Sequence, residues 1–272
     1  MKKGIVFLFL TSFFLCATFC WGQQDSSRKS ELSVGVNFQT KLHYFGRTDS
    51  LQSSALIPNI GYQLKNGLYI QGNFIFVQNK AISTTYAGTT IEGGYRFKPS
   101  KHFNGNVFYT QVLYKDKSQL PQSALKGLTG VNVAYTGPII NINAGGDLKF
   151  TKGQTDVGVT VGADHIFIIH GPNSHLAFAI DPSLYMYAGT HRFTKSYVEQ
   201  KSFLGFPVSA RESTQNYSRF DILSYEASVP LVAVFKKFFA TVVPAYVVPK
   251  NLLEGEDGEN LFYLTMGVGL KL

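Results

Sequence analysis

The sequence has 272 residues, of which 44% are hydrophobic and 14% aromatic, while only 15% are charged. The formal net charge of +8 falls to +6 without Lys2 and Lys3, and the other basic residues are scattered over predicted turns and loops. Nucleic-acid binding requires a basic patch or a recognised motif. The sequence has neither, so nucleic acid is excluded as a partner.

Residues 1–22 have the pattern of a secretory signal peptide. The basic head MKK is followed by the apolar run GIVFLFLTSFFLCATFCW and a small-x-small site at Cys20 and Gly22. Cleavage there starts the mature chain at Gln23. An uncleaved anchor is the alternative, since the run approaches membrane-spanning length, but the polar flank GQQDSSRKS favours cleavage. We expect export, with residues 23–30 as a short polar segment.

Both cysteines lie within this segment. Leu15 and Phe19 precede Cys16 and Cys20, where a lipidation site usually has a small residue, so a lipoprotein is not expected. The mature chain has no cysteine, which excludes a disulfide framework and a cysteine-based metal site. Outside the segment, no run of 18 apolar residues predicts a transmembrane helix.

From residue 31 onward the hydrophobic period is two. Residues 31–45 (ELSVGVNFQTKLHYF) place Leu32, Val34, Val36, Phe38, Leu42 and Tyr44 on one face, and Ser33, Gly35, Asn37, Gln39, Lys41 and His43 on the other. This alternation predicts a strand with one apolar and one polar face. Its length exceeds the ~5–6 residues of a typical soluble strand and suits a tilted membrane-spanning strand of ~9–11.

The same alternation recurs in TTIEGGYRF, INAGGDLKF, TDVGVTVGADH and HLAFAIDPSLYM. About twelve such segments start near residues 31, 53, 68, 84, 104, 125, 139, 155, 175, 219, 238 and 261. Proline removes a ladder hydrogen bond. We therefore expect bulges at the four prolines that fall inside predicted strands, namely Pro58, Pro182, Pro230 and Pro244.

The links between these segments alternate in length. The second, fourth, sixth, eighth and tenth are short, with the sequences KNG, KPSKHFN, TGP, HGPNS and KK. The other links are longer, except for the seventh, TKGQ. Outer-membrane barrels have short periplasmic turns and longer extracellular loops. The pattern therefore predicts an all-β fold, an antiparallel transmembrane β-barrel of about 12 strands over residues 31–272, with both termini on the short-turn side.

The last segment, LTMGVGLKL, ends the chain without a tail. Its polar Thr265, Gly267, and hydrophobic Leu270 and Leu272 resemble the C-terminal signal by which the assembly machinery recognises outer-membrane barrels. Leu272 departs from that pattern, which usually ends in an aromatic residue. The texture of IPNIGYQLKNGLYIQGNF looks like barrels of the Bacteroidetes type. The resemblance, to bacterial outer-membrane β-barrel proteins, implies residence in the outer membrane, with its lipids and the assembly machinery as partners.

The predicted inward face carries several charges. The candidates for lining the lumen are Lys41, Glu92, Arg96, Asp147, Lys149, Asp164, Asp181 and Glu226. Eight-stranded barrels are filled by side chains and sixteen-stranded ones hold water. Twelve strands fall between these cases. The charges therefore either line a pathway for a polar solute or pair with one another to fill the interior.

Two other chemistries have little support. His170 and His175 flank a predicted turn, but two histidines without a carboxylate and a third ligand rarely bind a metal. No cofactor motif is present, and no cofactor is expected. The chain lacks the His-x-Ser-Asn-Gly pattern of outer-membrane phospholipases and the Gly-x-Ser-x-Gly motif. We therefore predict a small channel or transporter for polar solutes. The alternative is a non-conducting binding or structural barrel that uses its long loops, and a lipid-modifying enzyme is a distant third.

Overall fold

The computed structural model describes residues 29–48, 52–81, 83–115, 125–151, 155–171, 176–190, 219–252 and 258–272. All regular structure in these ranges is β-strand. Within the same ranges, no helix is long and apolar enough to cross a membrane.

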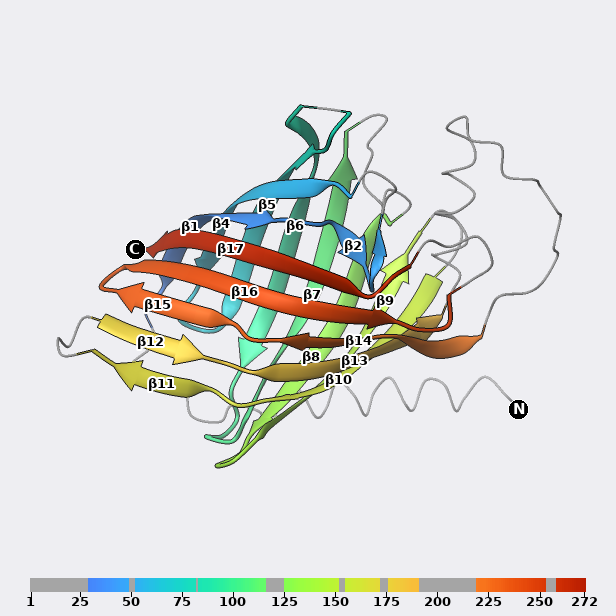
Figure 1. The fold of residues 1–272 in the computed structure, drawn as a ribbon. Helices are drawn as coiled ribbons and strands as arrows, with labels where there is room; N and C mark the ends of the chain where they lie inside the picture. Colours follow the sequence, from blue (N-terminus) through green and yellow to red (C-terminus); the bar gives the residue numbers. More distant parts are fainter. Residues whose placement is uncertain are drawn as a thin grey trace, which may run out of the picture.

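The strands form a closed antiparallel barrel with twelve crossings (Figure 1). The first seven crossings are β1 (Glu31–Gln39), β4 (Ser54–Gln63), β5 (Leu68–Gln78), β6 (Thr85–Phe97), β7 (Phe103–Tyr114), β8 (Gly127–Thr136) and β9 (Asn141–Phe150). Three crossings consist of two consecutive strands each: β10 (Thr155–Asp164) with β11 (Phe167–His170), β12 (Leu176–Ile180) with β13 (Ser183–Thr190), and β14 (Phe220–Ser228) with β15 (Leu231–Phe235). The last two are β16 (Phe238–Pro249) and β17 (Leu261–Lys271).

The first and last strands close the ring. β1 pairs with β17 in a continuous antiparallel register. The backbone groups of Leu32 and Leu272 exchange two hydrogen bonds of 3.1 and 2.8 Å, and Lys271 forms an ion pair of 3.1 Å with Glu31 beside them. A closed ring leaves no strand edge. Every backbone N–H and C=O group of the ladder can therefore bond to a neighbouring strand while the barrel is surrounded by lipid. The predicted all-β antiparallel barrel and its strand number are confirmed.

The outside of the barrel is apolar. Ile70, Val107 and Val131 are 56%, 44% and 42% exposed, whereas the inward-facing Tyr69 and Thr110 are 8% and 7% exposed. A soluble fold hides its large apolar side chains in a core. A barrel in lipid instead turns its apolar face outward, and the alternation along each strand produces this arrangement.

Short turns gather at one end of the barrel and longer links at the other. The β4–β5 turn is closed by a 2.9 Å hydrogen bond from Gly67 N to Leu64 O. Gly67 has φ +96, and a side chain there would collide with the carbonyl oxygen of Arg96, so this turn requires glycine. The C-terminus lies at the end of the barrel where β15 turns into β16 (Figure 1).

A line of interruptions crosses neighbouring strands. Pro182 separates β12 from β13, and Pro230 separates β14 from β15. Pro244 lies where β16 changes partner from β15 to β14. His165, in the break between β10 and β11, donates a 3.2 Å hydrogen bond to the carbonyl of Pro182. These three prolines thus lie at interruptions of strand pairing, and Pro58 lies in β4 where the pairing with β5 lapses between Leu56 and Asn59. The register shifts of the described strands lie elsewhere, at Ile75/Phe76 and Tyr187/Ala188.

The first predicted strand is shorter than its alternation indicates. β1 ends at Gln39, whose side-chain amide donates a 2.8 Å hydrogen bond to the carbonyl of Lys41 and so braces a bend. The expected continuation to residue 45 is therefore wrong. Leu42 and Tyr44 do not reach the lipid face; Leu42 packs against the buried Val77. The alternation continues past the bend because two further short strands follow it.

Candidate functional site

The first long link carries a small hairpin that folds into the lumen. It consists of β2 (His43–Tyr44) and β3 (Arg47–Thr48), and we call residues 43–48 the lumen hairpin. Phe45 and Gly46 form its turn with φ of 52 and 81. Positive φ at both central residues defines the two-residue type I′ turn, which matches the twist of paired strands. The conformation of the hairpin is therefore determined by its own turn and strand pairing.

The lumen hairpin reaches the far wall of the barrel. Phe45 lies 5.0 Å from the ring of Tyr187 on β13, and Lys149 Nζ on β9 lies 5.9 Å from the Phe45 ring centroid. β9 is the seventh of twelve crossings counted from β1, so it stands opposite the strand from which the hairpin departs. A Cβ atom at Gly46 would lie only 3.0 to 3.1 Å from Pro249 and Val247 of β16, so the turn lies close to this strand. The hairpin thus spans the lumen at the long-loop end.

A buried arginine anchors this hairpin. Arg47 is only 3% exposed. Its guanidinium donates hydrogen bonds to the carbonyl oxygens of Phe45 (3.3 Å), Leu223 (3.4 Å) and Lys250 (3.3 Å). Arginine presents five donors in a fixed fork, so one side chain can tie the hairpin to β14 and to the residue after β16. These carbonyl oxygens replace the water that burial removes from the guanidinium.

His43 secures the base of the hairpin. Its ring centroid lies 4.3 Å from that of Tyr263 on β17, and Nδ1 accepts a 3.3 Å hydrogen bond from the amide of Gly46. Burial lowers the pKa of His43 from 6.5 to about 4. A neutral imidazole is required for Nδ1 to accept that bond.

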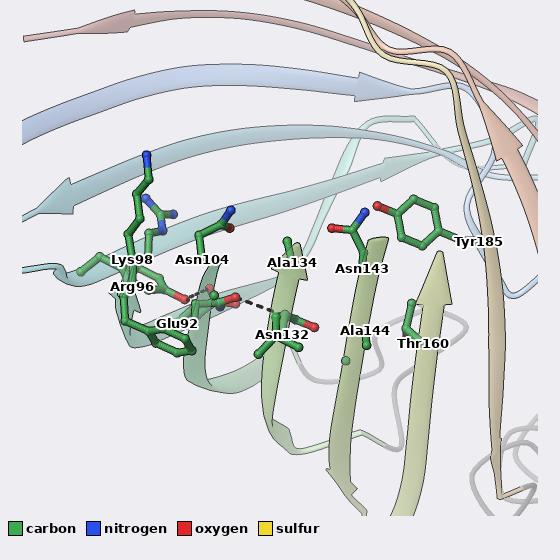
Figure 2. Close-up of a pocket in the computed structure, with 16 residues that line it drawn as sticks. Glu92, Arg96, Lys98, Asn104, Asn132, Ala134, Asn143, Ala144, Thr160 and Tyr185 are labelled. Carbon is green, nitrogen blue, oxygen red and sulfur yellow. Dashed lines mark hydrogen bonds between the residues drawn. The ribbon is translucent and has the colours of Figure 1, made fainter. Parts of the chain in front are cut away.

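The short-turn half of the lumen contains a cavity of about 620 Å³. It is lined by residues of β5 to β10 and β13 and by Lys98 in the turn after β6. Figure 2 shows Arg96 and Lys98 on one side of it and Asn143 and Tyr185 on the other. Ligand pockets commonly have volumes of about 300–1,000 Å³. The cavity is therefore large enough to hold a small organic solute.

One wall of the cavity carries Glu92 and Arg96, and both contact Tyr69. Glu92 accepts hydrogen bonds from the hydroxyl of Tyr69 (2.8 Å) and from Thr110 Oγ1 (2.9 Å). The Arg96 guanidinium lies 4.4 Å above the Tyr69 ring and donates to the side chain of Gln63. One negative and one positive charge therefore lie four residues apart on the inward face of β6, and these contacts satisfy both of them.

Asparagine amides continue this network around the cavity. Asn106 Nδ2 donates to the Tyr69 hydroxyl at 3.3 Å, and Asn132 Nδ2 donates to Asn106 Oδ1 at 3.3 Å. On β9, Asn143 donates to Asp164. Each amide has more donor and acceptor positions than these bonds use.

Small inward residues make room for large ones. A side chain at Gly94 would collide with the Tyr69 ring, and one at Gly162 would collide with the ring of Tyr185. Each tyrosine therefore lies against a glycine of the adjacent strand. This packing holds the rings along the wall rather than across the lumen, and it leaves the cavity open.

The residues predicted to line the lumen fall into separate groups. Glu92 and Arg96 line the cavity. Asp147 and Lys149 form an ion pair with each other near the lumen hairpin, and Lys41 lies in the bend after β1 rather than in a strand. The predicted lumen residues therefore do not form one site in the structure.

The remaining candidate carboxylates gather on the opposite wall. Asp164 accepts a 2.6 Å hydrogen bond from Asn141 and interacts electrostatically with Asp181. Glu226 hydrogen-bonds to Tyr263. No ion pair to these three carboxylates is present among the residues that the structure describes. The wall formed by β10 to β14 therefore carries an excess of negative charge.

Sequence reasoning missed the uncharged residues. Tyr69, Asn106, Asn132, Asn143 and Tyr185 line the cavity, whereas the predicted lumen residues are all charged. All five lie in the inward phase of their strands, so the same alternation would have found them. Arg47 was missed for another reason, because nothing in the pattern indicated that a loop residue returns to the lumen.

The metal candidates are not assembled in the described part of the chain. His170 ends β11, and His175 lies outside the described residues. Within the ranges that the structure describes, no group of three or more His, Cys, Asp or Glu side chains is placed to hold a metal ion.

The comparisons with known proteins agree with this architecture. No protein-family model and no curated protein matches the chain. Among solved structures, KdgM porin matches with a TM-score of 0.50 at 11% identity, over 88% of this chain and 98% of that one. An outer-membrane channel from Pseudomonas putida F1 has a TM-score of 0.48 at 13% identity, over 92% and 98%. LpxR from Salmonella typhimurium has a TM-score of 0.46 at 8% identity, over 88% and 99%.

At these identities, only the fold can be transferred. The likeness to KdgM porin shows that this chain has the fold of a porin barrel. The two structures with TM-scores below 0.5 carry no argument about activity. The function therefore has to be argued from the lumen.

Proposed function

We propose that this chain is exported, with residues 1–22 removed as a signal peptide, and serves as an outer-membrane channel for small polar solutes. The observation that carries the proposal is the two-part lumen. A polar cavity of about 620 Å³ occupies the short-turn half, and the lumen hairpin crosses the long-loop half. A barrel built only as a membrane anchor has no need of a polar cavity surrounded by ordered amides.

In this proposal the lumen hairpin is the constriction of the channel. Its contacts with Tyr187, Lys149 and Val247 come from three different strands. The solute pathway therefore narrows beside the hairpin and widens into the cavity. The outer-membrane lipids and the barrel assembly machinery complete the proposed set of partners.

A non-enzymatic role is part of the proposal. A hydrolase needs a nucleophile and a histidine within hydrogen-bond reach. Three of the four described histidines have other contacts: His102 Nδ1 lies 3.0 Å from the carbonyl oxygen of Thr136, His165 packs against Phe167, and His43 packs against Tyr263. These contacts support transport over lipid modification.

Single-channel recording in a planar bilayer tests the proposal. The refolded mature chain is compared with a variant in which residues 43–48 are replaced by glycine and serine, and with F45A. The matched control is F103A, which removes a lipid-facing ring that is 52% exposed. We expect small steps from the unmodified chain and from F103A, and severalfold larger steps from the other two variants. Silence from a folded hairpin variant overturns the channel and leaves the binding or structural barrel.

A further inference from the structure

The cavity in the short-turn half offers chemistry for one class of solute. We propose that it binds a neutral, polyhydroxylated ring such as a saccharide unit. This inference rests on the proposed function, since it names the solute class for the same lumen. It is argued from three features of the cavity wall: satisfied charges, free amide positions and a supported tyrosine ring.

The two charged side chains of β6 that line the cavity are already occupied, and Lys98 in the turn after β6 adds one further positive charge at its edge. Both carboxylate oxygens of Glu92 accept hydrogen bonds, from Tyr69 and from Thr110. Arg96 covers the Tyr69 ring and donates to Gln63. Glu92 and Arg96 therefore carry opposite charges, four residues apart on the inward face of β6, and each already has partners. An ionic solute would have to break these bonds, whereas a neutral solute would not.

The groups that remain for a ligand are amides. Asn106, Asn132 and Asn143 lie on three consecutive strands, β7, β8 and β9. Each has a donor group with two hydrogens and an acceptor with two lone pairs, and the hydrogen bonds described above use only part of that capacity. Vicinal hydroxyl groups both donate and accept hydrogen bonds. A row of amides therefore matches a polyol better than it matches a carboxylate or an ammonium group.

A tyrosine at the end of this row provides an apolar surface beside the amides. Tyr185 lines the cavity and lies close to Asn143 (Figure 2). Gly162 on β10 leaves the space that its ring occupies, so the ring is held against the wall by the backbone. A sugar ring has an apolar C–H face and a polar rim. It can therefore contact the aromatic ring and the amides at the same time, which a linear polar solute cannot do.

Saturation-transfer difference NMR on the detergent-folded mature barrel tests the inference directly. The probes are maltotriose, the zwitterion glycylglycine and galacturonate as a charged sugar. We expect transfer to maltotriose, with an apparent Kd about fivefold weaker in Y185A, as the loss of one aromatic contact implies. The matched control is Y109A, which removes a lipid-facing tyrosine that is 47% exposed and should leave binding unchanged.

The second variant separates binding from folding. G162A should displace Tyr185 by steric contact and weaken maltotriose binding while the barrel keeps its heat-dependent gel migration. Absence of transfer to maltotriose, equal binding in Y185A, or stronger binding of glycylglycine or galacturonate would each overturn the inference. The measurement needs no ion current. Saccharide binding by a silent barrel would overturn the channel alone, and conduction without binding would overturn the saccharide alone.

Discussion

At the scale of single residues, His43 makes the docking of the lumen hairpin depend on pH. Its pKa is lowered from 6.5 to about 4 by burial against Tyr263, which itself hydrogen-bonds to Glu226. Docking is fully stable above about pH 6.5, because His43 is then neutral whether it is docked or free. As the pH falls from 6.5 to 4, only the undocked form gains a proton, so docking weakens.

This predicts that acid widens the channel. Conductance of the unmodified barrel should rise between pH 6.5 and 4, with a loss of docking free energy of at most about 3 kcal/mol. H43F should remove this dependence because phenylalanine keeps the ring contact but cannot take up a proton. H102F, which changes a histidine at a short turn, is the control and should behave like the unmodified chain. An unchanged pH profile in H43F would exclude His43 as the sensor.

The carboxylates of the opposite wall predict the ion preference of the lumen. Asp164 and Asp181 lie side by side and have no ion pair among the described residues. We expect cation selectivity, measured as a reversal potential in a salt gradient, and a clear shift toward zero in D164N/D181N. Glu31→Gln is the control, since Glu31 is paired with Lys271 at the rim. Anion selectivity of the unmodified barrel would contradict this prediction.

At the scale of strands, alternation predicted most of the fold. The start of each of the twelve crossings lies within two residues of its predicted position, because a period of two is required wherever one face meets lipid and the other meets the lumen. The predicted extent of the first strand was wrong because the bend after Gln39 does not interrupt the alternation. β2 alternates as well, so only the contacts of Leu42 and Gly46 reveal that these residues are inside.

The candidate site was less predictable than the strands. Phase placed Glu92 and Arg96 in the lumen, but it could not show that Tyr69 and Gln63 satisfy them. Such contacts depend on the register between strands that lie apart in the sequence. The cavity exists because inward glycines such as Gly162 lie opposite tyrosines. Which glycine faces which tyrosine depends on the register between the strands, and the alternation within one strand does not determine that register.

The last strand carries a separate prediction about assembly. β17 places Thr265 and Gly267 in the inward phase and Leu270 and Leu272 in the outward phase, and it closes the ring with β1. Deleting Leu270–Leu272 should leave the protein in the periplasm, since the resemblance to the assembly signal is lost. Fractionation and immunoblotting measure this. Changing Leu272 to phenylalanine is the control and should keep or improve insertion. Normal insertion of the deletion would contradict the role of this signal.

At the scale of the whole molecule, closure should be visible on a gel. A closed barrel resists detergent because every ladder group is paired within the ring. The unboiled mature chain should therefore migrate differently from the boiled chain in detergent electrophoresis. G35V should lose much of this difference, because a side chain at Gly35 would collide with the backbone oxygen of Val268 across the closing pair of strands. Identical migration of boiled and unboiled samples of the unmodified chain would be evidence against a closed ring.

The long reach of Arg47 also sets an order of events. Its partners Leu223 and Lys250 lie 176 and 203 residues further along the chain. Contacts between such distant segments form late, because the intervening chain must first be ordered. The hairpin can reach these carbonyl groups only after β14 and β16 are in place. We therefore expect docking of Arg47 to be among the last steps of folding.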